Sequence, residues 1–298
     1  MEPTINYDWK KQIARLEGAY APSTIRAYHA DIESYVCWCE IEGFEAFPVS
    51  EDALCRYIED QGKSHASSTV NRRLYSLRRV LKLMSLDDVT QSEEVRLTHR
   101  RVLRAKLARP KQAKGMTREY LDQFLALQPD TLIGLRNRAM LSLGYEGLTR
   151  RSELVVIRDE DIEHLADGSL RVLIRRSKAD PFGQGRLICT SVQTGKLITE
   201  WIGKRGEGFP FLFCPVYKGK PIKRSITVSA LKRLIYAGND ILAASGETFS
   251  GHSMRVGAAQ DLLARGFDVA AIMRAGGWKS IDTLVRYLEN SHHNVWQQ

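Results

Sequence analysis

A basic segment without acidic residues divides this sequence into two parts with different patterns. From Arg96 to Lys114 there are eight Lys or Arg residues and no Asp or Glu, and the segment includes Pro110 and ends before Gly115. Pro, Gly and Lys together are typical of a linker. A chain of 298 residues is long enough for two domains with separate cores. We therefore expect a domain over 1–110, a linker over 111–116 and a second domain over 117–298.

The first part has the apolar spacing of successive helices. Ser23-Thr24 favours a helix start, and Gly43 favours its end. Ser50 introduces a second helix that ends near Gly62, and a third is expected over 69–84. The first domain is therefore predicted to be all-helical.

The second part mixes two periodicities. Helices are predicted over 118–127, 132–145 and 151–157, followed by strands over 170–174 and 186–190. Turn-forming residues separate the two strands, so they should pair as an antiparallel hairpin. The remainder, 194–290, is predicted to be helical. The fold class is therefore mainly α, with an all-helical N-terminal domain and a C-terminal α+β domain that contains a small antiparallel sheet.

The charge distribution indicates a polyanionic partner. The net charge is +9, and the stretch from Ser64 to Leu86 contains five basic residues and no acidic one. Arg, Tyr and Ser on one helix face are good phosphate ligands, although a solvated basic face would have the same composition. The candidate DNA contacts are Arg72, Arg73, Tyr75, Ser76, Arg79, Lys82, Arg100, Arg101, Arg104, Lys111 and Lys114.

The C-terminal part contains a set of residues able to hold a phosphodiester. His252 and Arg255 are three residues apart and would share a helix face. Arg150 and Arg255 are the candidate phosphate ligands, because a guanidinium binds two phosphate oxygens at once. Trp278 offers an indole N–H to another oxygen.

The same set includes groups for covalent catalysis. Tyr287 is the candidate nucleophile, and Lys178 in the hairpin loop would protonate the leaving oxygen. His252 would take the phenol proton or donate to the phosphate. Glu153 lies one helical turn from Arg150 and would orient the arginines. Each residue alone has a simpler interpretation, such as a core Tyr or a surface Lys, so the assignment depends on the whole set.

Neither a metal site nor a cofactor site is expected. The seven His residues have no metal-ligand spacing with Cys, and the five Cys residues form no C-x-x-C pair. An odd number of cysteines fits a reducing cytoplasm. No apolar run of about 18 residues occurs, so no membrane contact is expected.

Three motifs resemble the tyrosine recombinase family of phage and plasmid integrases. Residues 147–154 resemble its first arginine box, and His252-Ser253-Met254-Arg255 is similar to its His-x-x-Arg motif. Gly276-Gly277-Trp278 is followed nine residues later by Tyr287, as in the family's nucleophile segment. There are two departures: Arg151 stands where the family usually has an apolar residue, and Trp278 stands where most members have His.

The resemblance implies a function as well as a fold. It implies a helical core-binding domain and a catalytic domain that clamp double-stranded DNA with inverted half-sites. It also implies a homotetramer on two duplexes and site-specific recombination through a 3′-phosphotyrosine, without metal or ATP. The alternatives are a type IB topoisomerase, which would relax plasmids at many sequences, and a DNA-binding regulator, which would form no covalent adduct.

Overall fold

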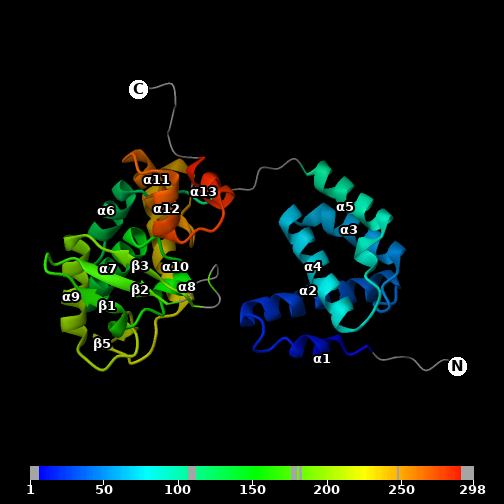
Figure 1. Ribbon diagram of the computed structural model, residues 1–298, viewed down its shortest axis with the longest axis horizontal. Helices are drawn as coiled ribbons and strands as arrows, with labels where there is room; N and C mark the ends of the chain where they lie inside the picture. The colour runs from blue at the N-terminus through cyan, green and yellow to red at the C-terminus, as the bar shows by residue number, and fades with distance from the viewer. Residues whose placement is uncertain (1–6, 107–111, 176–179, 181–182, 247, 290–298) are drawn as a thin grey trace, which may run out of the picture. The chain divides into compact units, whose positions relative to one another are not determined.

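The structure is a computed structural model that describes residues 7–106, 112–175, 180, 183–246 and 248–289. The chain forms two compact units, 1–110 and 111–298 (Figure 1). No helix in the described residues is both long enough and apolar enough to cross a membrane.

The first unit is helical throughout its described residues. Its helices are α1 (Trp9–Ala14), α2 (Pro22–Glu42), α3 (Glu51–Ser64), α4 (Ser67–Leu83) and α5 (Glu93–Ala105), with a 3₁₀ turn η1 (Val89–Gln91) before α5. Pro22 occupies the first turn of α2, where its missing N–H costs nothing, and Gly43 ends the helix with φ of 75°. The Ser50 hydroxyl accepts a hydrogen bond from the Ala53 N–H and caps α3. The helix starts and ends expected here are confirmed to within two residues.

Aromatic side chains form the centre of the first core. Tyr35 and Trp38 of α2 contact Tyr57 of α3 edge to face, with ring centroids 5.1 and 5.3 Å away. The apolar face of α4 covers this cluster, as its spacing predicts. That face consists of Val70, Leu74, Leu77 and Leu81, all buried.

The second unit combines helices with two small sheets. Its helices are α6 (Arg118–Ala126), α7 (Leu132–Glu146), α8 (Arg151–Leu154), α9 (Val192–Arg205), α10 (Val228–Ala237), α11 (Ser253–Ala264), α12 (Val269–Gly276) and α13 (Ile281–Leu288). Two 3₁₀ segments, η2 (Asp159–Asp161) and η3 (Gly238–Ser245), complete the helical elements. The strands are β1 (Ile162–His164), β2 (Leu170–Ile174), β3 (Arg186–Cys189), β4 (Val216–Tyr217) and β5 (Lys220–Pro221).

The predicted hairpin is confirmed as part of a larger sheet. β2 pairs antiparallel with β3, and Val172 faces Ile188 across the pair. β1 adds a third antiparallel strand on the other edge of β2, which the sequence did not indicate. β4 and β5 form a separate two-stranded hairpin.

Two buried helices, α7 and α11, hold the second core together (Figure 1). α7 packs against α9 and α11, and α11 also contacts α12 and α13. Residues 253–260 of α11 are all buried. Met116, which we placed in the linker, is fully buried here, and its N–H donates to the Ser253 carbonyl at 2.8 Å. The chain is therefore fixed to α11 just before α6 begins.

Candidate active site

The first arginine box folds into a short turn that pairs Arg150 with Glu153. Arg150 directly precedes α8, and its guanidinium donates to the Glu153 carboxylate at 2.6 Å. The same carboxylate accepts the Arg150 backbone N–H at 3.0 Å. The Glu153 side chain is only 1% exposed. It therefore fixes the orientation of Arg150, as the sequence suggested, and has little access to solvent.

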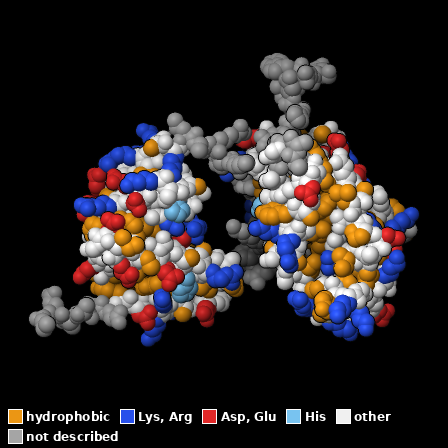
Figure 2. Space-filling view, turned by 180° about the vertical axis from the view of Figure 1, so that it is seen from behind, with side chains coloured by type: hydrophobic (Ala, Val, Ile, Leu, Met, Phe, Trp, Pro, Cys, Tyr) orange, Lys and Arg blue, Asp and Glu red, His pale blue; other side chains and the backbone are white. Residues whose placement is uncertain are grey.

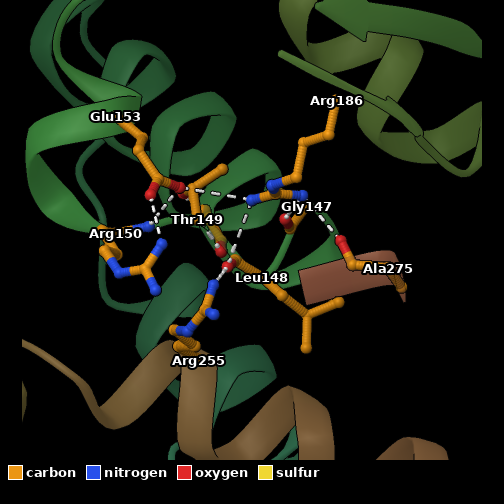
Figure 3. A network of polar contacts seen from close by, with 9 residues as sticks. Gly147, Leu148, Thr149, Arg150, Glu153, Arg186, Arg255 and Ala275 are labelled. Atoms are coloured by element: carbon orange, nitrogen blue, oxygen red, sulfur yellow. Dashed lines mark hydrogen bonds and ion pairs between the residues drawn. The ribbon is translucent and has the colours of Figure 1, made fainter. Parts of the chain in front are cut away.

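Arg255 projects from α11 toward the arginine box. It is 2% exposed, and its Nη1 donates to the Leu148 carbonyl (Figure 3). Its guanidinium lies 3.7 Å from the centroid of the Trp278 ring, a cation–π contact. Its Nη2 is buried and has no acceptor among the described residues. A buried donor without a partner is costly, so this nitrogen is suited to an incoming anion.

Trp278 and Tyr287 complete the described cluster. Trp278 is 7% exposed and meets the half-buried Tyr287 ring edge to face, with centroids 5.9 Å apart. The Gln260 side chain of α11 donates to the Tyr287 carbonyl at 3.0 Å. Trp278 therefore lies between Arg255 and Tyr287 and contacts both side chains.

Arg186 is a member of this network that the motifs did not indicate. Its guanidinium pairs with the Glu153 carboxylate at 3.2 Å and donates to three backbone carbonyls (Figure 3). These carbonyls belong to Gly147 at 3.0 Å, Leu148 at 3.4 Å and Ala275 at 2.6 Å. Arg186 therefore joins the start of β3, the arginine box and the end of α12.

The site carries more positive than negative charge. Among the described residues of this network, three guanidiniums, those of Arg150, Arg186 and Arg255, lie around one carboxylate, that of Glu153. Burial is the main cause that lowers the pKa of Arg255 to about 9, and the neighbouring Arg150 cation acts in the same direction. Burial also lowers the pKa of Arg186. An anion such as a phosphodiester would offset this repulsion.

Two further predicted catalytic residues are His252 and Lys178. His252 is exposed and directly precedes α11, where its backbone N–H donates to the Ser250 hydroxyl at 3.2 Å. Lys178 lies outside the described residues.

The structure corrects one predicted DNA contact in the first unit. Ser76 of α4 is fully buried, and its hydroxyl donates to the Asp31 carboxylate of α2 at 2.7 Å. The interpretation of Ser76 as a DNA contact is therefore wrong. Arg73 is also largely covered, with a side chain 15% exposed that donates to Gln61, whereas Arg72 remains about half exposed while pairing with Asp31 at 2.8 Å.

The other predicted contacts of the first unit lie at its surface, where basic and acidic side chains are interspersed (Figure 2). Exposed among them are Tyr75, Lys82, Arg100, Arg101 and Arg104. Arg79 is half-buried, with its guanidinium 5.2 Å from the Tyr20 ring centroid.

The second unit has its own basic surface. Lys114 is half-buried and lies over the Tyr120 ring, whereas Lys111 is outside the described residues. Lys and Arg side chains also gather at the β5 end of this unit (Figure 2), where Lys218, Lys220 and Lys223 are exposed. These three lysines follow no helical or strand periodicity in the sequence, because they lie in and around a two-residue strand and a short loop.

Comparisons with known proteins identify the family. Residues 114–294 match the model of the phage integrase family. Cre recombinase of Escherichia phage P1 is 29% identical over 292 residues, which cover 91% of this chain and 85% of Cre. An integrase/recombinase XerD homologue of Selenomonas ruminantium is 26% identical, over 93% of this chain and 84% of its own length. The chain belongs to the phage integrase family and is a tyrosine recombinase.

Solved structures support the same fold. The XerH site-specific recombinase bound to its difH substrate matches with a TM-score of 0.66 and 17% identity, over 96% of this chain and 80% of that one. A λ integrase dimer bound to a COC′ core site matches with a TM-score of 0.64 and 13% identity, over 97% of both chains. At this identity the likeness concerns the fold alone.

Proposed function

We propose that this enzyme is a site-specific recombinase that cuts and rejoins DNA through a 3′-phosphotyrosine on Tyr287, without metal or ATP. The observation that carries the proposal is the buried Arg255 guanidinium. Its Nη2 has no partner among the residues that the structure describes, and the guanidinium lies beside Trp278 and close to Arg150. A phosphate oxygen is the partner that such a group lacks.

In the proposed reaction, the phenol oxygen of Tyr287 attacks the scissile phosphorus, and the bond to the 5′ oxygen breaks. His252 accepts the phenol proton, and Lys178 gives a proton to the leaving 5′ oxygen. Arg150 and Arg255 hold the non-bridging oxygens as their negative charge grows. Trp278 donates its indole N–H to the same phosphate, and Glu153 holds Arg150 in place.

The second half of the reaction reverses these steps on a new strand. A 5′ hydroxyl attacks the phosphotyrosine, the Tyr287–phosphorus bond breaks, and the phenol regains its proton. The phosphodiester energy is kept in the covalent intermediate, so no nucleotide is consumed. The guanidiniums supply the positive charge that a metal ion would otherwise provide.

The proposal extends to the substrate and the assembly. Two of the similar structures contain DNA, which supports double-stranded DNA as the substrate. Closed two-fold arrangements of subunits require half-sites in inverted order. We therefore propose a homotetramer that joins two duplexes with inverted half-sites, acting on DNA in the cytoplasm.

The test is to trap the covalent intermediate. Random-sequence duplexes would be incubated with the protein and EDTA, and DNA that remains attached in SDS would be sequenced to find the half-site. We expect an adduct with the wild type and none with Tyr287→Phe, because phenylalanine has no oxygen to form the bond. Tyr287→Phe should keep its affinity for the selected half-site in a mobility-shift assay.

Three outcomes would contradict the proposal. An adduct in the Tyr287→Phe variant would require another nucleophile. Loss of the wild-type adduct in EDTA would contradict the metal-free reaction. Relaxation of supercoiled plasmids that lack the selected site would favour a topoisomerase instead.

A further inference from the structure

The proposed reaction does not explain how the Arg151 side chain is packed. It follows Arg150 directly, yet its guanidinium does not join the Glu153 network and packs against Gly251 instead. A Cβ on Gly251 would collide with Cζ and Nε of Arg151, so the guanidinium rests on bare backbone. Gly251 immediately precedes His252. The side chain is therefore held next to a proposed catalytic residue.

No residue within the described ranges forms a hydrogen bond or an ion pair with the Arg151 side chain. It is half-buried, so it has lost part of its hydration without gaining an acceptor. By contrast, Arg150 pairs with Glu153 and Arg186 has four acceptors. An apolar residue would pack at this position without that cost.

We propose that Arg151 binds a non-scissile phosphate of the DNA, next to the phosphate that Tyr287 attacks. A guanidinium can donate two parallel hydrogen bonds to a phosphate, and the partly exposed side chain is accessible to a DNA backbone. Arg150 and Arg255 already serve the scissile phosphate in the proposed reaction, which leaves Arg151 for its neighbour. This inference rests on the proposed function.

The test combines the neutralisation of one DNA phosphate with the substitution of one side chain and measures the rate of adduct formation. Duplexes of the selected half-site would each carry one neutral methylphosphonate, either at a phosphate flanking the scissile one or at a distant phosphate. We expect one flanking substitution to slow adduct formation by the wild type about ten- to hundredfold. On unmodified DNA, Arg151→Ile should form the adduct more slowly than the wild type by the same factor. On the duplex with that flanking methylphosphonate, the rate of Arg151→Ile should fall little further. The thermal midpoint of Arg151→Ile should be no lower than that of the wild type, which excludes misfolding as the cause.

Gly251 provides a matched control for position. Gly251→Ala should displace the Arg151 guanidinium and slow adduct formation in the wild-type background, but have a smaller effect in the Arg151→Ile background. Glu247, the acidic residue nearest to Gly251 in the sequence, lies outside the described residues, and Glu247→Gln should keep normal rates.

The inference would be overturned if Arg151→Ile formed the adduct at the normal rate. It would also be overturned if the rate reductions caused by Arg151→Ile and by the methylphosphonate multiplied at every phosphate tested. A loss in Glu247→Gln equal to that in Arg151→Ile would assign Arg151 to an internal ion pair. Absence of any adduct with the wild type would instead refute the proposed function, so the two failures are distinguishable.

Discussion

Arg255 is a buried cation whose Nη2 has no partner within the described part of the chain. Arg255→Met should slow cleavage by about 10²- to 10³-fold, because one transition-state donor is lost. The free energy of unfolding should stay the same or rise by about 1 kcal/mol, since a poorly compensated buried charge is removed. The Leu148 carbonyl would still receive a hydrogen bond from Arg186. Adduct rates and urea unfolding would measure both effects, and a large loss of stability would contradict this view.

Arg186 should behave in the opposite way. Arg186→Met would leave Glu153 with one cation fewer and deprive three carbonyls of a donor. We expect the free energy of unfolding to fall by about 3 kcal/mol, as when one partner of a buried ion pair is removed. Cleavage should fall as well, because the Glu153 carboxylate loses one of the cations that hold it in place. A variant with normal urea unfolding would show that these contacts contribute little.

At the scale of residues, motif spacing identified groups that the fold brings together. Arg150 and Glu153 lie about 100 residues or more before Arg255, Trp278 and Tyr287 in the sequence, and all five form one connected cluster in the structure. Arg186 could not be found in this way, because three of its partners are backbone carbonyls whose positions depend on the tertiary structure. Ser76 was misplaced because helical spacing does not reveal that α2 covers part of the polar face of α4.

Among the elements, α12 ends in a close contact that depends on glycine. A Cβ on Gly276 would collide with the Trp278 ring, and the side chain of Trp278 lies against Arg255. Gly276→Ala should therefore push the indole away from Arg255 and slow cleavage by about five- to thirtyfold, the loss of a contact worth about 1–2 kcal/mol. The adduct rate and the tryptophan fluorescence spectrum would be compared with those of Gly203→Ala, a position with open space. An unchanged rate would show that the indole position is not important.

The long elements could be predicted from local pattern, whereas the shortest ones could not. β1, β4 and β5 have only two or three residues, too few for a periodicity, and exist because a neighbouring strand pairs with them. The start of α6 is another example. Thr117 directly precedes it, but its side chain makes no capping bond, and the Arg118 N–H donates to Asp261 of α11 at 2.6 Å. A cap supplied from 143 residues away leaves no local signal.

For the whole molecule, the net charge of +9 predicts DNA binding that depends strongly on salt. The logarithm of the binding constant should fall linearly with the logarithm of salt concentration, because phosphate contacts release counterions. Lys82→Gln should reduce that slope by about 1, since the residue is exposed on α4. Ser76→Ala should leave it unchanged, because Ser76 is buried. Fluorescence anisotropy at several salt concentrations would measure the slopes, and a flat response would contradict a phosphate-binding surface.

Asp31 has a consequence for any attempt to retarget this enzyme to a new sequence. Its carboxylate, buried under α4, receives hydrogen bonds from Arg72 and Ser76. An engineer who exchanges Arg72 to alter base preference also removes a cation from a carboxylate that water cannot reach. Libraries that vary positions 31 and 72 together should therefore contain folded variants that are missing from libraries in which only surface positions vary.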